Sequence, residues 1–117
     1  MQKDAYQKMA DEDDKYTELW KLKQIRAIMA KEQYEHRAIA EQYDNDKKEL
    51  DKSLAAKKIN QAQYNYFLDE LGKRRKDKDK IARNDQIEAM KKLYDEIANY
   101  QKQKDKYKHY HCHLMRI

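Results

Sequence analysis

The sequence predicts an all-α protein in which two long helices form an antiparallel coiled-coil hairpin, with a turn near residues 55–60. Three observations lead to this prediction. The 117 residues include no Pro and one Gly, so the usual breakers of helices are missing. Charged residues make up 42% of the chain, which is typical of long helices with solvated faces. A capping motif near the middle of the chain separates one helical stretch from the next.

The apolar content sets an upper limit on the core. Leu, Ile and Phe together account for 17 of 117 residues and there is no Val, a content low enough for disorder to be an alternative. The net charge of only +5 and the ten Tyr, five Met and one Trp weigh against disorder. A large buried core is excluded.

The first helix is predicted from about residue 3 to residue 54, where the chain has good helix formers and neither Gly nor Pro. Six apolar residues fit the alternating steps of three and four of a coiled-coil seam: Leu22, Ile25, Met29, Ile39, Tyr43 and Leu50. The same steps place Glu32, His36 and Asp46 on the seam, and His36 there is interpreted as a tolerated polar interruption. Tyr6, Met9, Tyr16 and Trp20 follow another phase, so the apolar stripe must skip near Trp20.

The turn is predicted from a capping box. Asn60 is the expected N-cap, and Gln63 lies three residues on, where it can reciprocate. Ile59 and Tyr64 occupy the two positions of a hydrophobic staple. One continuous helix through Asn60 is the alternative.

The second helix is predicted from residue 61 to about residue 108, and residues 109–117 form a His-rich tail beyond it. Gly72 is a weak point in this helix, because glycine costs about 1 kcal/mol in a helix interior. The first apolar face consists of Tyr64, Phe67, Leu68 and Leu71, and a later heptad pattern consists of Met90, Leu93, Ile97, Tyr100, Tyr107 and Leu114.

Folding back at the turn would bring together residues whose numbers sum to about 115. The acidic run 11–14 would then lie beside Lys102, Lys104 and Lys106, and the basic run 73–83 would face Glu32, Glu35, Glu41 and Asp44. Opposite charges therefore match twice, which favours the hairpin over an open rod.

The basic run has two interpretations. Its cations are Lys73, Arg74, Arg75, Lys76, Lys78, Lys80 and Arg83. They are a candidate nucleic-acid contact, because clustered Lys and Arg bind phosphates. The favoured interpretation is a solvated helix face, with pairs Lys73–Asp77, Arg75–Asp79, Asp79–Arg83 and Asp77–Lys80 at helical spacing. No aromatic residue lies between residues 68 and 93 to stack on a base.

The tail holds four candidate metal ligands, His109, His111, Cys112 and His113, whose imidazole and thiolate groups suit zinc. A single local cluster is a weak pattern for a structural site, so no metal site is favoured and no cofactor is expected. One cysteine cannot form an internal disulfide, and no signal peptide or membrane span is recognisable, so we expect a cytoplasmic protein. The sequence has neither a Gly-rich phosphate loop nor a nucleophile elbow, and we expect no enzymatic activity.

Residues 48–71, KELDKSLAAKKINQAQYNYFLDEL, resemble the helix–turn–helix units of phage tail tape-measure-type coiled coils and of short C-terminal oligomerisation modules. The shared positions are Leu50, Leu54, Ile59, Tyr64, Leu68 and Leu71. The chain departs from the pattern at the turn, where those families usually carry Gly and this chain has Lys57 or Lys58. The resemblance implies a structural or assembly role and transfers no binding residue.

The predicted function is a non-catalytic structural or protein–protein interaction module, either a coiled-coil spacer or an assembly element. Two thin helices with a polar seam bury little apolar surface, so we expect a homo-oligomer or docking into a larger protein assembly. The alternative is a nucleic-acid-binding helical protein that uses the basic segment 73–83.

Overall fold

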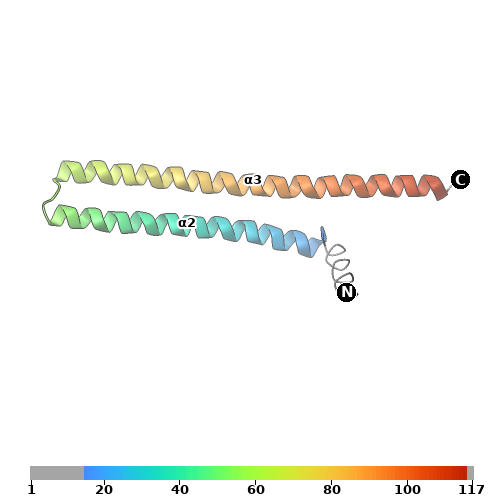
Figure 1. Cartoon of the computed structure of the whole chain (residues 1–117), viewed down its shortest axis with the longest axis horizontal. Helices are drawn as coiled ribbons and strands as arrows, with labels where there is room; N and C mark the ends of the chain where they lie inside the picture. Colours follow the sequence, from blue (N-terminus) through green and yellow to red (C-terminus); the bar gives the residue numbers. More distant parts are fainter. Residues whose placement is uncertain (1–14, 116–117) are drawn as a thin grey trace, which may run out of the picture. The chain divides into compact units, whose positions relative to one another are not determined.

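The computed structural model describes residues 15–115, and the side chains of residues 15–106. Its regular elements are two helices, α2 (Glu18–Ala55) and α3 (Gln61–Met115), joined by a short turn (Figure 1). The all-α prediction is therefore confirmed. The chain divides into two compact units. The turn unit is Met29–Ile87, and the terminal unit combines the described residues up to Ile28 with those from Glu88 onward.

The start of α2 differs from the prediction. Residues 3–14 lie outside the described residues. The prediction of one uninterrupted helix from about residue 3 to residue 54 is wrong, because Tyr16 has the left-handed φ of 68°. The next residue, Thr17, caps α2: its hydroxyl oxygen accepts a hydrogen bond from the Trp20 backbone N–H at 3.2 Å. A threonine side chain at this position satisfies one of the free N–H groups of the first turn, so α2 begins at Glu18.

The end of α2 is a Schellman motif. The Lys58 N–H donates to the Ser53 carbonyl at 2.9 Å, and the Lys57 N–H donates to the Leu54 carbonyl at 3.0 Å. Lys57 has the left-handed φ of 57° that this motif requires. The position that glycine normally takes in this motif is therefore occupied by a lysine.

The capping box at the start of α3 is confirmed. The Gln63 N–H donates to the Asn60 side-chain oxygen at 2.9 Å, and the Asn60 N–H donates to Gln63 Oε1 at 3.0 Å. The alternative of one helix through Asn60 is wrong. Ile59 and Tyr64 are both half-buried, and their contact as a staple stays a prediction.

The stripe of half-buried residues on α2 agrees with the predicted seam from Glu32 to Leu50, including His36 and Asp46. Nearer the start of α2 the half-buried residues lie one position before the predicted seam residues. Leu22 and Met29 are 43% and 48% exposed, whereas the preceding Lys21 and Ile28 are half-buried. The predicted skip in the stripe is therefore present, but it lies after Met29 rather than near Trp20.

On α3, Tyr64, Leu68 and Leu71 are half-buried as predicted, whereas Phe67 is 45% exposed. Farther along the helix, the predicted heptad positions from Met90 to Tyr100 are half-buried or buried. Among the described side chains only Ala82 and Leu93 are buried, at 4% and 6% exposed. Helix α3 continues to Met115, so the predicted end near residue 108 is wrong; the side chains of Tyr107 and Leu114 lie outside the described ones.

Replacing Lys57 by glycine should stabilise the fold. A side chain with a Cβ costs roughly 1–2 kcal/mol in the left-handed region, and glycine avoids most of this cost. We expect Lys57→Gly to raise the free energy of unfolding by about 1 kcal/mol in urea titrations. Lys58→Gly is the matched control, since Lys58 has no positive φ and its glycine variant should not be stabilised. Equal changes in the two variants would contradict the Schellman assignment.

Candidate functional site

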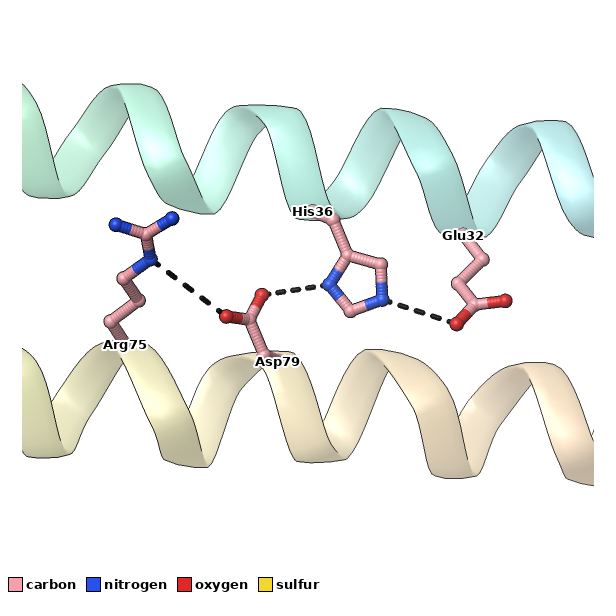
Figure 2. Close-up of polar contacts among 4 residues, drawn as sticks. All are labelled: Glu32, His36, Arg75 and Asp79. Carbon is pink, nitrogen blue, oxygen red and sulfur yellow. Dashed lines mark hydrogen bonds and ion pairs between the residues drawn. The ribbon is translucent and has the colours of Figure 1, made fainter.

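A polar cluster lies in the seam of the turn unit and joins its two helices (Figure 2). His36 extends from α2, and its Nδ1 lies 2.7 Å from Oδ1 of Asp79 on α3. Its Nε2 lies 3.1 Å from Oε1 of Glu32, one helical turn earlier on α2. Both ring nitrogens therefore face a carboxylate. We call Glu32, His36, Asp79 and Arg75 the His36 cluster.

The protonated imidazole is the form that suits this geometry. An imidazolium donates from both nitrogens, whereas a neutral ring donates from one and leaves the other carboxylate without a donor. The hydrogen bond to Asp79 is the largest cause that raises the pKa of His36, followed by the hydrogen bond to Glu32, while partial burial acts in the opposite direction. Two charge-assisted hydrogen bonds thus depend on a single proton.

Arg75 completes the cluster from α3. Its Nε lies 3.9 Å from Asp79 Oδ2, and its guanidinium carbon lies 5.1 Å from the ring centroid of Tyr43 on α2. The second interaction is a cation–π contact across the two helices. An aromatic ring therefore reaches the basic segment from the other helix, although no aromatic residue lies between residues 68 and 93.

The predicted pairing of residue numbers was the signal that could have found this cluster. His36 and Asp79 have numbers that add to 115, as do Asp51 and Tyr64, whose hydroxyl donates to Asp51 Oδ1 at 2.6 Å. The sequence interpretation placed His36 on the seam and treated it as an isolated polar residue. In the structure the His36 ring instead links α2 to α3 through its hydrogen bond with Asp79.

The basic segment pairs differently from the prediction. Lys73 contacts Asp69 at 3.1 Å and Glu70 at 3.8 Å rather than Asp77, and of the predicted pairs only Arg75–Asp79 is present. Asp79 bonds to His36 instead of Arg83. Within residues 15–106, no ion pair joins this segment to the acidic residues of α2, and five of its cations make no ion pair at all: Arg74, Lys76, Lys78, Lys80 and Arg83.

An aromatic group holds the terminal unit together. The rings of Tyr16 and Tyr100 stack at 4.3 Å with 17° between their planes, and Trp20 lies 4.9 Å from Tyr16. The Tyr16 hydroxyl donates to Glu96 Oε1 at 2.8 Å, and this hydrogen bond raises the pKa of Tyr16. The acidic run 11–14, predicted to lie beside Lys102–Lys106, lies outside the described residues.

The four candidate metal ligands His109, His111, Cys112 and His113 have helical backbone in α3, but their side chains lie outside the described ones. Among side chains 15–106, no group of three or more His, Cys, Asp or Glu residues is arranged to hold a metal ion. Neither described helix combines the length and the apolar character that a membrane crossing requires.

Comparisons of the chain with protein-family models, with curated proteins and with solved structures returned no match. The resemblance of residues 48–71 to tape-measure-type coiled coils therefore stays a prediction.

The His36 cluster should make stability depend on pH. Because the folded-state pKa of His36 is raised above 6.5, its contribution is fully present below that value and is lost as the pH rises through the folded-state pKa. We expect the Tm of the wild type to fall between about pH 6 and pH 8.5 by more than the Tm of His36→Gln falls.

The control for this experiment lies in the variant itself. His36→Gln keeps the three histidines of the tail, so the difference between the two Tm–pH curves reports on His36 alone. Parallel curves would show that the protonated ring does not bridge Glu32 and Asp79.

Proposed function

We propose that this chain is a non-catalytic structural or protein–protein interaction module, a coiled-coil spacer or assembly element. The main support is the imbalance between buried and exposed apolar side chains. Only Ala82 and Leu93 are buried in the described part of the chain. Nine large apolar side chains are 43–71% exposed: Leu19, Leu22, Met29, Tyr34, Tyr66, Phe67, Ile81, Ile87 and Tyr94. Protein association would remove such surface from water.

In this proposal the helices pack as an antiparallel coiled coil. Two cross-helix hydrogen bonds, His36–Asp79 and Tyr64–Asp51, support the arrangement because residue numbers rise on one helix as they fall on the other. The half-buried residues of α2 from Glu32 to Leu50 also follow steps of three and four, as a coiled-coil seam does. The resemblance of residues 48–71 to oligomerisation modules points to the same role.

Sedimentation equilibrium combined with small-angle X-ray scattering tests this function. We expect the mass to rise from one chain toward two or more over a hundredfold range of concentration. The maximum dimension of the single chain should be close to the length of α3, about 83 Å for its 55 residues at 1.5 Å each. A dimension near 150 Å would mean that the helices do not fold back. A constant single-chain mass would remove self-assembly from the proposal.

One observation favours nucleic-acid binding as a second candidate function. Five cations of the basic segment lack ion pairs within residues 15–106, so their charge is available to phosphate groups.

Lys76, Lys80 and Arg83 are exposed and, among the described side chains, form neither hydrogen bonds nor ion pairs with α2, so replacing all three by Gln should leave the fold intact. If the chain binds nucleic acid, the triple variant should lose at least tenfold in affinity for a duplex. Wild-type binding should also weaken steeply between about 50 and 200 mM salt. Replacing Lys47, Lys48 and Lys52 of α2 by Gln provides a control with the same change in net charge. Binding that does not weaken with salt, or that the triple variant retains, would exclude phosphate contact by this segment.

A further inference from the structure

Two open grooves lie side by side between α2 and α3 in the turn unit. The groove nearer the turn measures about 300 Å³ and is lined by Asp46, Glu49, Leu50, Ser53, Phe67, Glu70, Leu71 and Arg74. The second groove measures about 310 Å³ and is lined by Ile39, Gln42, Tyr43, Asp46, Leu71, Arg74, Arg75 and Lys78. Because Asp46, Leu71 and Arg74 belong to both, the grooves form one continuous surface, which we call the groove face.

Charge on the groove face is divided between its two ends. The part toward the turn carries Glu49, with Glu70 next to Leu71, and the far part carries Arg75 and Lys78. Asp46 and Arg74, one of each sign, lie where the grooves meet. Apolar side chains are present at both ends, with Leu50 and Phe67 near the turn, Ile39 at the far end, and Leu71 and Tyr43 between them.

We propose that the groove face binds the groove face of a second copy of this chain across a two-fold axis near Leu71. This inference rests on the proposed assembly function and identifies the surface that carries it. A two-fold axis that lies in the interface and is perpendicular to the helices brings each patch against its own copy with the helix direction reversed. The acidic end of one chain therefore meets the basic end of the other, and the match occurs twice.

The spacing of the charges agrees with an axis near Leu71. The cross-helix contacts pair residues whose numbers add to 115, which puts Glu49 of α2 level with residue 66 of α3. Glu49 thus lies about five residues on one side of Leu71, and Lys78 lies seven residues on the other. At 1.5 Å per residue these distances are about 8 and 10 Å. The two-fold axis brings Glu49 of each copy to the level of Lys78 of the other.

The charged groups are free to exchange partners. Glu49 pairs within its own helix with Lys52, and both side chains are about three-quarters exposed. Glu70 pairs with Lys73 at 3.8 Å. Such exposed pairs contribute little, so exchanging them for contacts across an interface costs little. Arg74 and Lys78 make no ion pair within the described side chains.

The apolar groups supply the driving force for this association. Phe67 is 45% exposed at one end of the groove face, Ile39 lines the other end, and Tyr43 lies between them near Leu71. The two-fold axis places Phe67 of one copy toward the end that holds Ile39 in the other. Burial of an aromatic ring against such side chains stabilises interfaces, and it would occur at both ends.

A charge-swap experiment by sedimentation equilibrium tests the surface. Glu49→Lys and Lys78→Glu should each weaken wild-type dimerisation at least tenfold, because each places like charges opposite one another twice. A 1:1 mixture of the two variants should recover dimerisation to within about threefold of the wild type, since both charge pairs are then opposite in sign. The double variant in one chain should recover it as well.

The matched controls are Glu41→Lys and Lys76→Glu. Both positions are exposed on α2 and α3, lie outside the groove face and change the net charge equally, so dimerisation should stay within threefold of the wild type. Circular dichroism of every variant checks that its helices are intact.

The outcomes separate the surface from the function. If the wild type associates but the groove variants behave like their controls, the groove face is not the interface and the assembly function stands. If each variant is weakened and neither the mixture nor the double variant recovers, the two-fold arrangement is wrong. A wild type that stays monomeric overturns both this inference and self-assembly.

Discussion

Two helices cannot enclose a core, and the rest of this structure depends on that constraint. A helix in a pair has one neighbour, so each side chain between the two helices keeps water on at least one side. In the described part of the chain, burial is nearly complete only for Ala82, whose side chain is a single methyl group, and for Leu93. With so little apolar surface removed from water, the hydrophobic effect alone does not select one register of α2 against α3. Directional contacts have to do so.

The His36 cluster supplies such contacts in the turn unit. Its two hydrogen bonds join carboxylates on both helices to one ring, and a shift of α3 by one residue would move Asp79 out of reach of Nδ1. Desolvation costs little because the groups are only half-buried, and every buried side-chain polar atom in the described residues has a hydrogen-bond partner. The Tyr64–Asp51 hydrogen bond fixes the same register near the turn. Polar positions between α2 and α3 reduce the apolar contact of the two helices, but they define how the helices align.

The turn could be predicted because its contacts lie within one helical turn. Ion pairs could not be predicted where several partners lie at equally suitable spacings. Asn60 and Gln63 form a capping box because both partners lie within one helical turn, where the sequence spacing determines the geometry. The start of α2 was missed because Thr17 has Trp20 at the reciprocal position, so no capping box marks it. Lys73 has acidic residues at Asp69, Glu70 and Asp77, all at helical spacing. Each such pair is worth only about 0.2–0.5 kcal/mol, so spacing cannot rank them. The predicted register was sufficient to pair His36 with Asp79, but His36 was interpreted as an isolated polar residue. The groove face could not be predicted, because its lining residues alternate between the two helices.

Arg75 connects the interior of the turn unit to its proposed interface. Its side chain belongs to the His36 cluster through Asp79 and to the groove face through the lining of the second groove. The carboxylate and the Tyr43 ring hold the guanidinium from two directions, so its position is set before any partner arrives. A pre-positioned cation loses less side-chain entropy on association than a free lysine does. The contact that aligns the two helices therefore also fixes one of the charges that the second copy would meet, and fold and association share a residue rather than compete for it.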